Sequence, residues 1–218
     1  MSQKILDVIV QHKIVAIVRG VESRWMIDVA KALYTGGVQC LEITFNPADE
    51  VVSRDTLHSI NLVSKEFAGK IFVGAGTVLT VQNVEDAVNA GAEFMISPNV
   101  SQAVIEKTKV LGKISMPGAY TPTEAQQAYE YGADIIKIFP ADIVGPDYFK
   151  AIKAPLPHLK LAAVGGVTVD NIAEFIKAGA DVFGISSSLV NIKLVKEKNW
   201  KAIEDAARSY TEAILNFK

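Results

Sequence analysis

The chain has 218 residues, half of them hydrophobic, so it can bury one large core in a single domain. Its net charge is −2 and its lysines are scattered, which argues against a nucleic-acid partner. The single cysteine, Cys40, excludes an intramolecular disulfide. The N-terminal segment lacks the apolar centre of a signal peptide, and no apolar run approaches membrane-spanning length. We therefore expect a soluble cytoplasmic protein.

Short β-branched runs alternate with helical patterns along the whole chain. An amphipathic helix is expected before the first strand, and a longer one, near residues 198–215, after the last. Eight strands are predicted, at residues 14–19, 39–44, 71–74, 94–97, 114–116, 135–139, 161–164 and 182–186. Helices are predicted between them, for example at residues 22–35, 81–90, 100–110, 122–131 and 170–178.

A glycine motif recurs where a helix should end and the next strand begin. It reads AGAE at residues 90–93, YGAD at 131–134 and AGAD at 178–181. The glycine suits a helix C-cap, and its small neighbour lets helix and strand pack closely. Strands that alternate with helices pair in parallel, so eight units predict one α/β domain over residues 1–218, a (β/α)8 TIM barrel with an extra N-terminal helix. An open doubly wound sheet is the alternative, although no G-x-G-x-x-G motif follows the first strand.

Lys137 is the most informative residue, because it interrupts an apolar run that should form a buried strand. A buried ammonium is costly unless it is paired or loses its proton. A neutral lysine is an amine nucleophile that can attack a carbonyl carbon. The alternative is a long side chain that reaches out of the strand end into solvent.

Glu42 is the candidate acid/base, and its side chain should share one face of its strand with Cys40 and Thr44. If that face lines the barrel, Glu42 points toward the same interior as Lys137, with Arg19 at an equivalent height. A carboxylate paired with an arginine for structure alone is the alternative. The three charged residues together favour a functional cluster at the carboxyl ends of the strands, where the active sites of such barrels lie.

Two glycine- and serine-rich loops follow the seventh and eighth strands, at the common phosphate site of these barrels. The residues expected to bind a phosphate are Gly165, Gly166, Gly184, Ser186 and Ser187. Ordinary turn glycines and helix-capping serines are the alternative. A metal site is not expected, because the three histidines are far apart and show no ligand spacing.

Several motifs, taken in order, resemble one known family. They are IVAIVR at residues 14–19, GGV at 36–38, LEIT at 41–44, VGAGTV at 73–78, ISP at 96–98, MPG at 116–118, KIFP at 137–140 and GGV at 165–167. Over nearly its whole length the chain resembles the class I 2-keto-3-deoxy-6-phosphogluconate (KDPG) aldolases, also called 4-hydroxy-2-oxoglutarate (KHG) aldolases.

The resemblance implies cleavage of KDPG to pyruvate and glyceraldehyde 3-phosphate, with 4-hydroxy-2-oxoglutarate as a further substrate. It also implies a homotrimer that needs no cofactor. Lys137 would form the Schiff base and Glu42 would shuttle protons. Arg19 and Thr77 would hold the substrate carboxylate.

Two positions depart from the gluconate-type pattern. Asn46 stands where these enzymes often carry an arginine, and Ala163-Val164 stands where Pro-Thr is common. The second departure resembles the 2-keto-3-deoxy-6-phosphogalactonate (KDPGal) aldolases, so the carbon 4 epimer is the alternative substrate. Residues expected to line the substrate pocket and set its specificity are Thr44, Asn46, Pro98, Phe139 and Val164.

Two other functions fit the same residues. A phosphosugar isomerase or epimerase would use the phosphate loops and Glu42 as a base, with Lys137 as an electrostatic group. A phosphometabolite-binding module would show no turnover and would leave both buried charges unexplained. Borohydride trapping separates the aldolase from both, because only a Schiff base is fixed by reduction.

Overall fold

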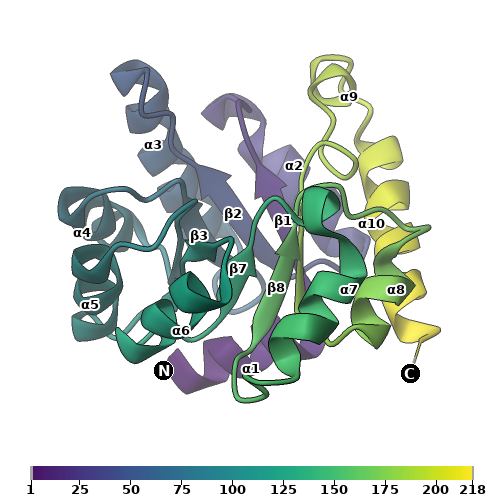
Figure 1. The fold of residues 1–218 in the computed structure, drawn as a ribbon. Coiled ribbons are helices and arrows are strands. Elements are labelled where there is room, and N and C mark those ends of the chain that lie inside the picture. Colours follow the sequence, from purple (N-terminus) through teal and green to yellow (C-terminus); the bar gives the residue numbers. More distant parts are fainter. Residues whose placement is uncertain (1, 218) are drawn as a thin grey trace.

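Parallel strands form the centre of the protein, whose computed structural model describes residues 2–217 (Figure 1). Within those residues there are nine strands: β1 (Ile14–Val18), β2 (Cys40–Thr44), β3 (Phe72–Gly76), β4 (Phe94–Ile96), β5 (Ile114–Met116), β6 (Gly118–Ala119), β7 (Ile136–Ile138), β8 (Leu161–Val164) and β9 (Val182–Ile185). Their order in the sheet is β5-β4-β3-β2-β1-β9-β8-β7-β6, and all of the pairings are parallel.

The two edge strands of this order, β5 and β6, are consecutive in the chain, so the sheet curls into a nearly closed barrel. Only Pro117 separates them, and proline has no backbone N–H with which to continue a ladder. Its carbonyl still accepts a hydrogen bond of 2.9 Å from the backbone N of Lys137. The predicted TIM-barrel fold is confirmed, and β5 coincides with the strand expected at residues 114–116, but the short strand β6 was not predicted.

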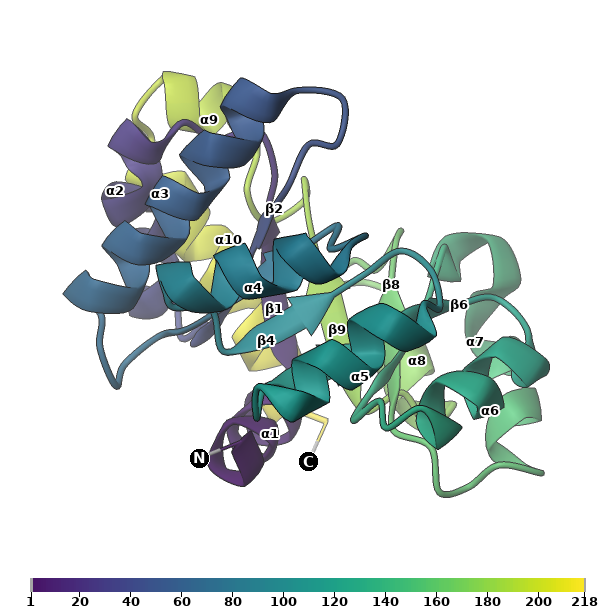
Figure 2. The same cartoon turned by 90° about the vertical axis from the view of Figure 1, so that its left-hand side faces the viewer.

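Helices surround the barrel on its outer side. They are α1 (Ser2–His12), α2 (Ser23–Thr35), α3 (Glu50–Glu66), α4 (Val81–Ala90), α5 (Gln102–Val110), α6 (Pro122–Glu130), α7 (Ala141–Lys153), α8 (Ile172–Lys177), α9 (Ile192–Lys196) and α10 (Trp200–Leu215). In both Figure 1 and Figure 2, α1 lies below the strands rather than beside them. None of these helices is long and apolar enough to cross a membrane, as far as residues 2–217 show.

The barrel interior is apolar at the end where the strands begin. Ile5 and Ile9 of α1 pack there against inward-facing side chains such as Val15, Cys40 and Phe94. Burial of this kind stabilises a fold by about 25 cal/mol per Å² of apolar surface. The lower half of the barrel is therefore a packed core, and polar chemistry is confined to the opposite end.

Candidate active site

A cavity of about 460 Å³ lies at the carboxyl ends of the strands. Its walls come from β1 through β4 and from β7 through β9, together with the loops that follow these strands. The predicted site residues that line it are Arg19, Glu42, Thr77, Pro98, Lys137, Phe139, Val164, Gly165, Gly166, Gly184, Ser186 and Ser187. Residues far apart in the sequence thus meet at one end of the barrel.

Lys137 lies on β7 and is only 8% exposed. Its Nζ lies 4.7 Å from the centre of the Phe139 ring. Burial lowers the pKa of Lys137, the positive charge of Arg19 acts in the same direction, and the carboxylate of Glu42 opposes both. At a given pH, Lys137 is therefore a neutral amine in a larger fraction of molecules than an exposed lysine is. A nucleophilic lysine must be neutral.

Glu42 lies on β2, and its side chain is 2% exposed. Burial raises the pKa of Glu42, whereas Lys137, the hydrogen bond from Thr44 and Arg19 each lower it. Oε1 accepts that hydrogen bond from the Thr44 hydroxyl at 3.3 Å. Oε2 is buried and has no hydrogen-bond partner within residues 2–217. Burial thus drives this acid and the nearby amine toward their neutral forms, the states in which one can donate a proton and the other can attack.

Arg19 and Thr77 directly follow β1 and β3, the two strands that flank β2 in the sheet. Arg19 Nη2 donates a hydrogen bond of 3.4 Å to Thr77 Oγ1. Thr77 has a φ of 56°, a left-handed conformation that is unfavourable for a β-branched residue. Strain of this kind is retained where the surrounding structure requires it. A guanidinium and a hydroxyl in contact provide donors suited to a carboxylate.

The loop after β8 is held open by two consecutive glycines in the left-handed region, Gly165 with a φ of 99° and Gly166 with a φ of 67°. Other residues adopt two such conformations in a row only with strain. Asn171 fixes the loop, because its amide nitrogen donates to Gly166 O at 2.9 Å and its amide oxygen accepts from Thr168 N at 2.8 Å. This loop and the serine loop after β9 line the same side of the cavity.

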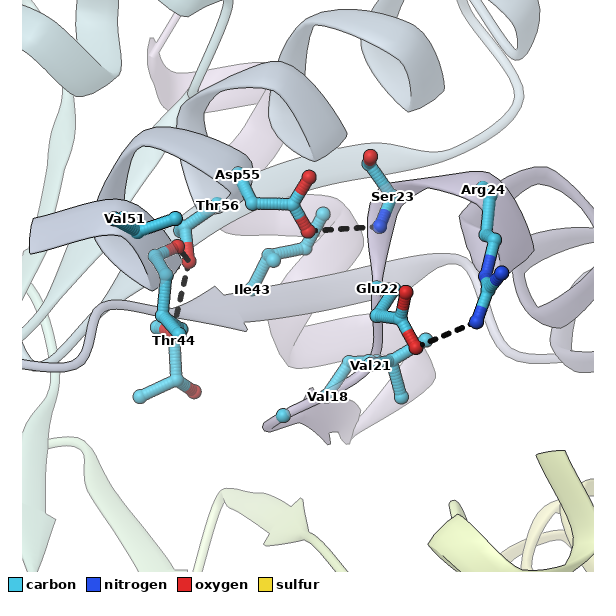
Figure 3. Close-up of a pocket in the computed structure, with 12 residues that line it drawn as sticks. Val18, Val21, Glu22, Ser23, Arg24, Ile43, Thr44, Val51, Asp55 and Thr56 are labelled. Carbon is cyan, nitrogen blue, oxygen red and sulfur yellow. Dashed lines mark hydrogen bonds and ion pairs between the residues drawn. The ribbon is translucent and has the colours of Figure 1, made fainter. Parts of the chain in front are cut away.

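Thr44 and Asn46 do not line the cavity. Thr44 instead lines a neighbouring pocket of about 410 Å³ between β2, α2 and α3, shown in Figure 3, and reaches the site only through Glu42. Asn46 is exposed on the loop before α3, where its side-chain oxygen accepts from Ala48 N at 3.2 Å. The expectation for Asn46 differs from the structure because β2 ends at Thr44 and the chain then turns outward toward α3.

Four lining residues were not predicted: Ile17, Val167, Thr168 and Ser188. Ile17 is two residues before Arg19, so strand alternation places both side chains on the same face. The others directly continue the two predicted phosphate loops. No group of His, Cys, Asp and Glu side chains within residues 2–217 is arranged to hold a metal ion.

Comparisons with known proteins decide the family. Residues 5–206 match the model of the family described as KDPG and KHG aldolase. The chain belongs to this family. It is therefore an aldolase, a carbon–carbon lyase, and the resemblance seen in its motifs is confirmed.

Relatives within the family carry two substrate names. A probable 2-dehydro-3-deoxy-6-phosphogalactonate aldolase of Rhizobium meliloti (strain 1021) is 40% identical over 180 residues, 82% of each chain. The solved structure described as native KDPGal has a TM-score of 0.85 and 31% identity, and the match covers 94% of this chain and 95% of that one. A KDPG aldolase from Legionella pneumophila, with pyruvate captured as a covalent carbinolamine intermediate, has a TM-score of 0.81 and 26% identity over 91% of this chain and 93% of that one.

Proposed function

We propose that this aldolase works through a Schiff base on Lys137 and cleaves KDPGal, also named 2-dehydro-3-deoxy-6-phosphogalactonate, to pyruvate and glyceraldehyde 3-phosphate. The observation that carries the proposal is the buried amine of Lys137 in one cavity with the buried carboxyl of Glu42. The pyruvate carbinolamine of the Legionella enzyme supports it, because a carbinolamine is the adduct of an amine and a ketone.

Lys137 forms the covalent intermediates of the reaction. Its neutral Nζ attacks the ketone carbon 2, and loss of water from the carbinolamine gives an iminium ion. The iminium accepts the electron pair of the bond between carbons 3 and 4 as that bond breaks. Pyruvate is left on the enzyme as an enamine.

Glu42 transfers the protons of the reaction. As the carbon–carbon bond breaks, Glu42 removes the proton of the carbon 4 hydroxyl, directly or through a water molecule, and glyceraldehyde 3-phosphate leaves. Glu42 then returns the proton to carbon 3 of the enamine. Hydrolysis of the resulting iminium releases pyruvate and restores the amine of Lys137.

The two ends of the substrate would lie against the two polar walls of the cavity. Arg19 and Thr77 offer donors to the carboxylate. At the other wall, Gly165 and Gly166 offer backbone N–H groups, Gly184 leaves room, and the hydroxyls of Ser186 and Ser187 complete a phosphate site. A substrate bound in this way has its ketone between the walls, within the region that Lys137 lines.

Val164 supports the galactonate epimer as the substrate. It lines the cavity next to Gly184, where an added Cβ would lie 2.8 Å from Val164 Cγ2. An apolar side chain at this place cannot hydrogen-bond a substrate hydroxyl, whereas threonine can. The Rhizobium relative carries the galactonate name as well. KDPG, the substrate first expected, is the second candidate, because the similar Legionella structure is a KDPG aldolase.

A coupled assay decides between the two epimers. Pyruvate release is measured with lactate dehydrogenase and NADH for KDPG and for KDPGal under the same conditions. A higher kcat/KM for KDPGal supports the proposal, and a higher value for KDPG returns the function to the gluconate type. Release of pyruvate from neither epimer would overturn the proposed substrate class.

We also propose that residues 1–218 form one aldolase domain that assembles as a cytoplasmic homotrimer, as the family resemblance implies. Each chain has a mass of 23.5 kDa. Light scattering after gel filtration should therefore give three times that mass, and a monomeric mass would contradict the assembly. Cell fractionation tests the location.

A further inference from the structure

Thr44 and Glu42 form a buried polar pair on one face of β2. They are two residues apart on the strand, so both side chains point the same way. Thr44 Oγ1 donates a hydrogen bond of 3.3 Å to Glu42 Oε1, and Thr44 is only 3% exposed. Gly76 of β3 lies close to the same oxygen, because a Cβ added to Gly76 would overlap it. Oε1 is thus next to both the Thr44 hydroxyl and the backbone of β3.

Oε2 of the same carboxyl group lies in a different environment. It is fully buried, and no atom of residues 2–217 forms a hydrogen bond with it. A buried polar oxygen without a partner costs free energy, and such groups in proteins call for an explanation. Because Glu42 lines the cavity, a substrate hydroxyl or a bound water can supply the missing partner.

We propose that Thr44 is a positioning residue that holds Oε1 of Glu42, so that Oε2 carries out the proton exchange with the substrate. This inference rests on the proposed Schiff-base function, because it concerns the proton shuttle of that reaction. When Oε2 is protonated, Oε1 is a carbonyl oxygen, and it accepts the hydrogen bond from Thr44 as it does in the ionised state. The proton can therefore arrive and leave without breaking the contact that orients the group.

A second buried threonine contacts the backbone of Thr44 from outside the barrel. Thr56 of α3 is buried, and its hydroxyl donates to Thr44 O at 3.1 Å. In Figure 3 the side chain of Thr44 points away from Thr56, so its hydroxyl is left for Glu42. The Thr56 hydroxyl donates to Thr44 O and Val52 O and does not hydrogen-bond the Glu42 carboxyl group. Thr56 is a suitable control position.

The test compares T44V, T44S and T56V with the wild type. Valine has nearly the shape of threonine but cannot donate, serine keeps the hydroxyl, and T56V removes a buried hydroxyl that does not touch Glu42. Borohydride trapping of pyruvate reports on Lys137 alone. Exchange of the pyruvate methyl protons with deuterated water, followed by NMR, reports on proton transfer to carbon 3.

T44V should still be trapped, and its exchange rate and kcat should fall about 5- to 20-fold, the effect of one hydrogen bond to a reacting group. The lost donor stabilised the ionised carboxylate, so the acidic limb of the kcat profile should move to higher pH. KM should change little. T44S should restore the rate and the pH profile, and T56V should keep both close to the wild type.

A double-mutant cycle sharpens the test. If Thr44 acts through Glu42, T44V should have no further effect on exchange in an E42Q background. Wild-type exchange and pH dependence in T44V, or an equal loss in T56V, would overturn the inference. If T44V does not fold, as judged by circular dichroism, T44A makes the same comparison. A wild type that borohydride cannot trap would instead overturn the proposed Schiff-base function.

Discussion

The carboxyl group of Glu42 occupies the space beside Gly76 in which any other residue would carry its Cβ. Strands β2 and β3 place Thr44 opposite Gly76 in the parallel register, and Glu42, which is paired with Gly74, reaches this space from two pairs below. The glycine is therefore required by the close approach of a side chain. One backbone position on β3 decides where an acid on β2 can lie.

G76A should displace the Glu42 carboxyl and lower kcat by about 10²-fold or more, within the range of a general acid/base. Pyruvate trapping should persist, because Lys137 lies on β7. A75G is the matched control, since Ala75 packs in the outer core on the other face of β3 and its loss should leave kcat nearly unchanged. A folded G76A enzyme with normal kcat would contradict this role of the glycine.

E42Q should lower kcat for cleavage by about 10²–10⁴-fold, because the amide neither accepts nor returns the proton of the reaction. E106Q, the same change at an exposed glutamate, serves as the control and should have no effect on kcat. The measurement is steady-state pyruvate release by both variants. Near-normal turnover by E42Q would return Glu42 to a structural role.

The stability of the protein should depend on pH through Glu42. Burial raises the pKa of Glu42 above its ordinary value of 4.5, so above that pH the native state keeps a proton that the unfolded chain has released. The stabilisation by this proton is present at low pH and is lost as pH rises through the raised pKa. E42Q cannot ionise, so its Tm relative to that of the wild type should rise as the pH is raised above 4.5. A constant Tm difference, measured by calorimetry, would contradict the raised pKa.

V164T should shift the ratio of kcat/KM values toward KDPG. The new hydroxyl can hydrogen-bond a substrate hydroxyl, and differences of this kind change discrimination by about tenfold or more. V167T is the control, because Val167 lines the same cavity in the loop after β8. Assays of both epimers with the three proteins decide the matter. An unchanged ratio in V164T would place epimer discrimination elsewhere.

Much of the fold could be predicted from local signals. The recurring glycine motif marks helix ends, and its glycines Gly91, Gly132 and Gly179 have φ values of 108°, 99° and 95°. That left-handed conformation ends a helix and needs no tertiary information to be read. The additional strand β6 could not be predicted in the same way, because it depends on which neighbour each side of Pro117 pairs with.

The site could be predicted as far as it depends on strand ends. Parallel strands bring their carboxyl ends together, so Lys137 and Arg19 line the same cavity although they are far apart in the sequence. The contact between Thr44 and Glu42 and the exposure of Asn46 depend on side-chain rotamers and on the path of one loop. Periodicity carries no information about either.

Borohydride trapping with pyruvate, followed by peptide mapping in a mass spectrometer, tests the central claim most directly. The account predicts one reduced adduct on the peptide that contains Lys137 in the wild type and none in folded K137A. K160A, which removes an exposed lysine just before β8, should be labelled like the wild type. An unlabelled wild type, or an adduct on another lysine, would contradict the assignment of Lys137 as the Schiff-base residue.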